Sequence, residues 1–103
     1  MAVYSEIPVI DAPSQRLSTV LSDRRIDLAL DFNETTGRWT LGVAVDGTVV
    51  ERGRRIVLGI NLFRDLGAAY GELRAVDWGG TGAQPGRTEL PSGTVRLIHR
   101  AEG

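Results

Sequence analysis

Alternation of apolar and polar residues between positions 25 and 50 constrains the fold of this chain more than any other feature. The apolar members are Ile26, Leu28, Leu30 and Phe32 in a first run, and Trp39, Leu41, Val43 and Val45 in a second. A period of two places alternate side chains on opposite faces of a β-strand. Residues 33–37 supply a turn, and Asp46-Gly47 is a strong signal for a two-residue hairpin. The stretch therefore predicts a three-stranded antiparallel meander, whose apolar face must be covered by the rest of the chain.

The remainder of the chain favours further strands. Residues 14–21 fit a strand or a short helix, and we favour a strand because a hairpin there would continue the meander. Gly53 interrupts the third strand of the meander and predicts a bulge or a tight corner. Residues 72–78 and 94–100 supply two more strands, the last with Val95 facing inward. We expect an all-β, mainly antiparallel fold that is either a small barrel or a sandwich, because these two share strand patterns.

One short helical turn is expected near residues 61–66. Asn61 can cap it, Leu62 and Leu66 share a face, and Gly67 suits the position after its end. Residues 79–87, by contrast, form a glycine-rich loop without a large apolar side chain. We interpret this loop as a flexible surface connection, because no Gly-Lys-Ser/Thr follows it and no helix is expected to open after it and offer its N-terminus to a phosphate.

Length and composition predict one domain over residues 1–103. A chain of this length with 42% hydrophobic residues can bury one core without disulfides or metals. Residues 1–13 contain Pro8 and Pro13 and predict an extended N-terminal arm, with an edge strand near residues 7–10. The arm can be a strand or tail on its own domain, or it can pack on a neighbouring subunit.

Several classes of chemistry lack support in the sequence. The chain has no cysteine, which removes disulfides, thiolate metal sites and thiol catalysis. The net charge of −1 gives no general attraction to nucleic acid or to anionic lipid. No segment approaches the roughly 20 apolar residues of a membrane span, and the first residues do not resemble a signal peptide. We therefore expect synthesis in a cytoplasm and no membrane insertion.

We predict no catalytic residue, no cofactor and no metal. His99 is the only histidine, and histidine mechanisms need a nearby oriented partner. Asp27 and Asp31 share one strand face and are interpreted as solvated charges without the spacing of a calcium loop. Nucleic-acid barrels interleave basic and aromatic side chains on one sheet face. Here Phe32 and Trp39 fall in the core-facing set, so we expect no nucleic-acid specificity.

Two groups of side chains are candidates for protein contacts. The first is apolar and lies in the N-terminal arm, and the second is a basic cluster at the corner around Gly53. The candidate interface residues are Val3, Tyr4, Ile7, Val9, Ile10, Arg52, Arg54 and Arg55. Exposed apolar patches often mark interfaces, and arginine, which supplies all twelve basic residues, makes bidentate bonds and stacks on aromatic rings.

A series of spaced features resembles the baseplate plug family of contractile-tailed bacteriophages, of the cyanophage type. In order along the chain, these features are Ile7-Pro8, Pro13, Gln15, Leu28 to Asn33, Trp39, Asp46-Gly47, Gly53, Ile56 to Gly59, Asn61-Leu62, Gly71 to Leu73, Pro85 and a closing strand after Gly93. The resemblance covers nearly the whole chain. Residues 89–93, Glu-Leu-Pro-Ser-Gly, depart from it, because a Leu-Gly turn is expected there.

The resemblance implies a non-enzymatic structural protein of the virion tail baseplate. It also implies contacts with other tail proteins (the hub, the tail tube and the wedge) and several copies placed by symmetry. It supplies no catalytic or cofactor residue. Two alternatives remain open from the residues themselves. One is a small β-barrel that binds carbohydrate or peptide through the glycine-rich loop and an exposed Trp78, and the other is a nucleic-acid barrel.

Overall fold

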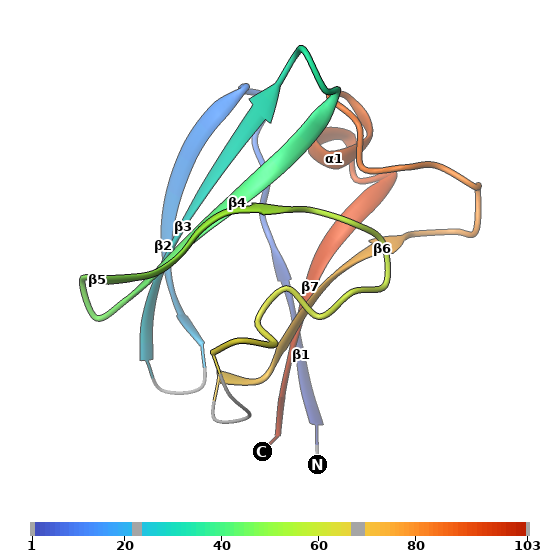
Figure 1. Ribbon diagram of the computed structural model, residues 1–103. Coiled ribbons are helices and arrows are strands. Elements are labelled where there is room, and N and C mark those ends of the chain that lie inside the picture. The colour runs from blue at the N-terminus through green and yellow to red at the C-terminus, as the bar shows by residue number, and fades with distance from the viewer. Residues whose placement is uncertain (1, 22–23, 67–69, 103) are drawn as a thin grey trace.

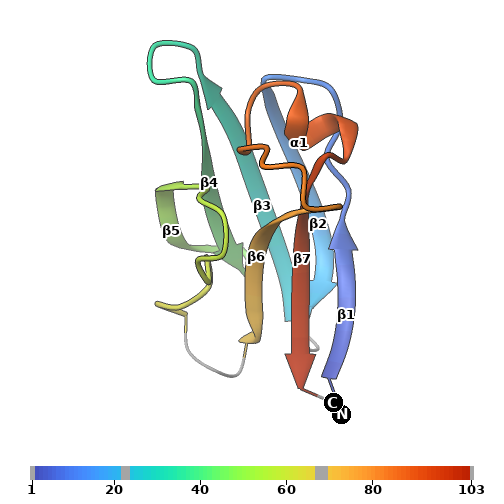
Figure 2. The same ribbon diagram turned by 90° about the vertical axis from the view of Figure 1, so that its right-hand side faces the viewer.

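The computed structural model describes residues 2–21, 24–66 and 70–102, which form two facing β-sheets (Figure 1). The elements are β1 (Ala2–Ile7), β2 (Ser14–Leu21), β3 (Arg24–Asn33), β4 (Arg38–Val45), β5 (Thr48–Arg55), β6 (Glu72–Asp77), α1 (Glu89–Ser92) and β7 (Val95–Glu102). One sheet has the order β2-β3-β4-β5 and the other has the order β1-β7-β6. Figure 2 shows the smaller sheet in front of the larger one, with both chain ends side by side.

The predicted meander is confirmed as β3, β4 and β5. Leu30 pairs with Leu41 and Phe32 with Trp39, so the two alternating runs present their apolar sets on the same face. Asp46 and Gly47 both have positive φ, 49° and 86°, as the two central residues of a type I′ turn require. The strand expected at 14–21 is β2, which pairs antiparallel with β3 along its full length and adds a fourth strand.

Two irregularities bend β5 away from a flat ladder. The register shifts between Leu41 and Val43, and again between Val43 and Ala44. Gly53 lies at the first shift with φ of +62°, a conformation that glycine adopts without strain. The bulge predicted at this glycine is therefore confirmed, and it increases the local twist of the edge strand.

The three-stranded sheet brings together segments that are far apart in the sequence. β7 lies in the centre and pairs antiparallel with β1 on one side and with β6 on the other. Ala2–Ile7, in the stretch expected as an arm, thus form a strand of the chain's own domain. In β6, Leu73 and Ala75 are buried and Val76 is at the surface. In β7, Val95 is buried as expected.

One hydrophobic core fills the space between the sheets. The larger sheet contributes the apolar faces of β3 and β4, and the smaller sheet contributes alternate residues of β6 and β7. Within the described residues the strands fall into two separate sheets, each with two edge strands. Of the two predicted architectures the structure is therefore the sandwich, because the closed ring of paired strands that defines a barrel is absent from this described part.

Within the described residues, the predicted helical turn and the α-helix lie at different places. At the predicted site, residues 61–66 form successive three-residue turns, in which the N–H of Arg64 donates to the carbonyl of Asn61 and that of Leu66 to the carbonyl of Phe63. The side chain of Asn61 accepts from the N–H of Phe63 at 3.0 Å, so its capping role is confirmed. Gly67 lies outside the described residues.

The α-helix itself is α1, where we expected only a turn. Pro91 sits in its single turn, where a missing N–H costs no helical hydrogen bond, and Gly93 ends it with φ of +87°. Proline and glycine are typical of both turns and helix ends, so their presence in residues 89–93 did not distinguish the two.

Candidate interaction surfaces

His99 belongs to the core. The side chain is 1% exposed and its ring packs edge-on against Phe63. Its Nε2 lies 2.8 Å from the carbonyl oxygen of Tyr70, and since a carbonyl only accepts, this nitrogen donates. This hydrogen bond satisfies the donor nitrogen of the buried ring.

Asp27 and Asp31 lie on the outer face of the four-stranded sheet, as predicted. The hydroxyl of Ser18 donates to Asp27 at 2.5 Å, and that of Ser14 donates to Asp31 at 2.7 Å. The Ser18 hydrogen bond, aided by the charge of Arg25, holds the pKa of Asp27 below its usual range. No group of three histidine, cysteine or acidic side chains that could hold a metal is present in the described part of the chain.

A shallow groove of about 510 Å³ crosses the same outer face. Small residues form its floor, since Ala29 pairs with Gly42 across β3 and β4. The bulged strand β5 forms one wall, and Arg16 of β2 lines the other side. Trp78 does not line this groove, so the glycine-rich loop and the groove are two separate features.

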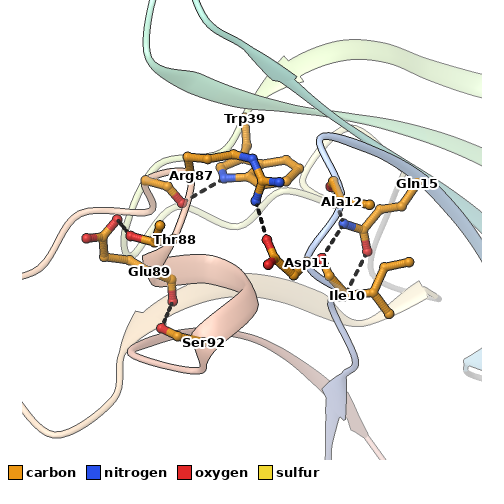
Figure 3. Close-up of polar contacts among 10 residues, drawn as sticks. Ile10, Asp11, Ala12, Gln15, Trp39, Arg87, Thr88, Glu89 and Ser92 are labelled. Atoms are coloured by element: carbon orange, nitrogen blue, oxygen red, sulfur yellow. Dashed lines mark hydrogen bonds and ion pairs between the residues drawn. The ribbon is translucent and has the colours of Figure 1, made fainter.

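The loop that follows β6 is anchored to the rest of the fold (Figure 3). The indole N–H of Trp39 donates to the carbonyl of Gly86 at 2.8 Å. The guanidinium of Arg87 lies over the same indole ring and forms an ion pair with Asp11 at 2.8 Å. Close by, the buried side chain of Gln15 bonds the backbone of the β1–β2 connection. These contacts join β4, the glycine-rich loop and the N-terminal connection at one end of the sandwich.

Asp77 holds the start of the glycine-rich loop, and acid should release it. The hydroxyl of Thr81 and the N–H of Gly82 donate to its carboxylate, which lowers the pKa of Asp77 from its ordinary value. Because the pKa of Asp77 is lower in the folded than in the unfolded chain, its ionised carboxylate stabilises the fold at pH values above the unfolded-state pKa of about 3.9. This stabilisation is lost as the pH falls through the folded-state pKa. We expect the amide resonance of Gly82 to titrate below pH of about 3.9. In Asp77→Asn this titration should be absent; if it persists, Asp77 is not the anchor.

The structure separates the two predicted groups of interface residues. Val3, Tyr4 and Ile10 are 53%, 65% and 62% exposed, whereas Val9 is half-buried and Ile7 is in the core at 3%. In the basic cluster, Arg54 forms ion pairs with Asp65 and Glu51, while Arg52 and Arg55 are exposed. Figure 2 places β1 and β5 at opposite sides of the molecule, so the two groups do not form one patch.

A third surface was not predicted, and it is the outer face of the three-stranded sheet. Alternate residues of β1, β7 and β6 point away from the core there, because their neighbours along each strand point in. We call this surface the arginine–aromatic face, and its residues are Tyr4, Glu6, Glu72, Arg74, Val76, Trp78, Arg96, Ile98 and Arg100.

Ion pairs and a ring contact link the side chains of the arginine–aromatic face. The guanidinium of Arg96 lies 4.6 Å from the ring centre of Trp78 and 3.1 Å from Glu6. Arg74 and Arg100 both reach Glu72, at 3.3 Å and 3.9 Å. The alternation within β7 was visible in the sequence, but the pairing of β7 with two distant strands was not. Only that pairing brings Tyr4, Trp78 and the arginines onto one surface.

Comparison with known protein families shows to which family this chain belongs. The family model described as cyanophage baseplate Pam3 plug gp18 matches residues 4–102. The chain belongs to this baseplate plug family. The matched range covers both sheets and nearly the whole chain, so the resemblance drawn from spaced residues is confirmed. No match was found among curated proteins.

Membership of the baseplate plug family places the chain among structural components of the phage tail baseplate, in the virion. The described helix, α1, has four residues, and no helix in the described ranges is long and apolar enough to cross a membrane. Several residues that carried the resemblance to the plug family hold the fold. Gln15 ties the β1–β2 connection, Asp46-Gly47 makes the hairpin, and Asn61 bonds the N–H groups of both Phe63 and Leu73.

Proposed function

We propose that this plug-family chain is a non-enzymatic subunit that acts by binding neighbouring baseplate proteins, among which the hub, the tail tube and the wedge are the candidates. The proposal includes several copies arranged by the symmetry of the tail. The observation that carries it is the arginine–aromatic face, which combines Tyr4 and Trp78 with three arginines on the outer surface of one sheet.

The composition of this face suits a protein partner. Tryptophan, tyrosine and arginine dominate the residues whose loss weakens protein interfaces most. Trp78 is 49% exposed and is held from one side by Arg96, so little side-chain freedom remains to be lost on binding. Glu6 and Glu72 balance two of the three arginine charges, which leaves a net charge of about +1. This small excess favours a protein surface over nucleic acid, whose binding depends on many uncompensated cations.

The exposed members of the sequence-predicted groups extend this proposal. Val3 lies within β1, next to Tyr4 but on the other face of the strand, and Ile10 lies in the connection that follows β1; both are exposed and would extend a contact along this edge of the molecule. Val9 is half-buried and would contribute less. Arg52, Arg54 and Arg55 lie on the other side of the sandwich, where they would meet a different neighbour. Ile7 is left out of the proposed surface, because its side chain is already in the core.

Replacing Trp78 by alanine tests the proposed function. We expect binding to the neighbouring baseplate protein to weaken by about 2 kcal/mol, or about thirtyfold, because a central aromatic anchor is lost. The measurement is the amount of the subunit in tails purified from a phage that lacks its own copy and is complemented with the variant. Val20→Ala is the matched control, since Val20 is 70% exposed on the other sheet.

The expected result is depletion of Trp78→Ala from tails and normal incorporation of Val20→Ala. Both purified variants should remain folded by circular dichroism. Normal incorporation of Trp78→Ala would contradict the proposed role of the arginine–aromatic face. Binding of Trp78 to a soluble oligosaccharide or peptide, followed by fluorescence quenching, would instead favour the binding-module alternative, which requires the exposed indole observed here.

A further inference from the structure

β1 offers an open hydrogen-bonding edge. It pairs with β7 along one side, from Ala2 to Ile7. In an antiparallel ladder every second residue directs its N–H and C=O away from the neighbouring strand. Within the described residues, the backbone of β1 makes no other hydrogen bond to the main chain. Its exposed edge also carries two large apolar side chains, Val3 and Tyr4.

Two of the other three edges are protected in ways that natural sheets use against unwanted pairing. β5 has two bulges and four charged residues. The outer edge of β6 is covered by the segment that precedes it, because the N–H of Gly59 donates to Ala75 and that of Leu62 to Leu73. The third edge, β2, is less protected; it has one charged residue, Arg16, and its exposed positions are mostly polar. β1 has no proline, no bulge and a single charge, Glu6, which is held by Arg96.

The sequence of β1 is complementary to itself in the antiparallel register that sets Ser5 opposite Ser5. We propose that β1 pairs with β1 of a second copy of this chain, around a two-fold axis at Ser5. This register keeps the core-side residues of both copies on one face, because it sets odd positions opposite odd positions. Val3 then lies opposite Ile7 of the second copy, and Tyr4 lies opposite Glu6 of the second copy. No like charges face each other, and Val3 gains an apolar neighbour.

This pairing joins the two small sheets into one six-stranded sheet with the order β6-β7-β1-β1-β7-β6. The arginine–aromatic faces of the two copies then become continuous, with both Tyr4 side chains near the axis. The inference goes beyond the proposed function, because it concerns contact between copies rather than contact with another baseplate protein. It can fail while the proposed function holds, and the reverse is also possible.

Charge substitution at Ser5 tests the pairing, since this exposed residue meets its own copy at the axis. The purified chain is studied by analytical ultracentrifugation from about 10 µM to about 1 mM, a range suited to a small interface. We expect a concentration-dependent dimer. Ser5→Glu and Ser5→Arg should each weaken it at least about tenfold through like-charge repulsion. An equimolar mixture of the two should restore the dimer, which also proves that both variants are folded.

Two further variants keep the test decisive. If the Ser5 variants do not fold, Tyr4→Glu takes their place, because it sets a carboxylate against Glu6 of the second copy on an exposed surface. Val20→Glu is the matched control on the edge of β2 and should leave the dimer unchanged. A chain that stays monomeric to about 1 mM overturns the inference. So does an oligomer that is insensitive to the Ser5 and Tyr4 substitutions, or one that only Val20→Glu disrupts.

Discussion

Trp39→Ala is expected to lower the free energy of unfolding by about 4 kcal/mol, within the range for removing a large buried aromatic side chain. The indole is fully buried, packs edge-on against Phe32 and donates its N–H to the carbonyl of Gly86. Alanine leaves a cavity and removes the shorter of two hydrogen bonds to that carbonyl, which keeps only the bond from the N–H of Leu90 at 3.3 Å. The ring also supports Arg87, whose ion pair with Asp11 ties the N-terminal connection to the glycine-rich loop. Because small domains are stable by about 5–15 kcal/mol, this loss removes a large share of the stability of the fold.

Urea denaturation followed by far-ultraviolet circular dichroism measures this effect. Trp39→Phe should cost less than Trp39→Ala, because a phenyl ring refills part of the cavity but cannot donate to Gly86. Trp78→Ala is the control for loss of an indole as such. Its ring is half exposed, so the change should stay below about 1 kcal/mol. Equal destabilisation by Trp39→Ala and Trp78→Ala would mean that the Trp39 contacts do not support the fold.

Gly71→Ala is expected to be similarly damaging, with a loss of about 2–5 kcal/mol from backbone strain and overpacking together. Gly71 has φ of +74°, in the left-handed region that disfavours any Cβ. A Cβ built there lies 2.3 Å from the carbonyl oxygen of Arg100 and 2.9 Å from Nε2 of His99. The backbone carbonyl cannot move without disturbing β7, and a shift of the imidazole would break its hydrogen bond to Tyr70.

Gly80→Ala separates the two causes. Gly80 has φ of +65°, but a Cβ there meets no atom within 4 Å. It should therefore show only the conformational penalty, about 1–2 kcal/mol. Thermal and urea denaturation of both variants give the comparison, and the His99 ring resonances should move only in Gly71→Ala. If the two variants are equally stable, the backbone of Gly71 does not lie close enough to β7 in solution for a Cβ to clash with Arg100 or His99.

Local patterns predicted those parts of the fold in which neighbours in sequence are neighbours in space. The runs containing Leu30 and Leu41 alternate strictly. The turn at Asp46-Gly47, whose residues both have positive φ, leads β4 directly into its partner β5. The cap at Asn61 and the bulge at Gly53 likewise depend on a few adjacent residues. Such features depend on local backbone preferences and on a period of two in the apolar residues, and both are present in the sequence itself.

The surfaces depend instead on long-range packing. Glu6 and Arg96 are ninety positions apart in the chain and 3.1 Å apart in space. Their meeting requires β1 to pair with β7, the last strand of the chain. No local preference specifies this pairing; it is selected because it buries the apolar faces of both sheets in one core. For the same reason Ile7 proved to be core rather than surface. By itself the sequence determined the meander with its turns, the strand that extends it and the family; only tertiary packing decided that the N-terminal residues form β1 and which side chains share a face that a partner could bind.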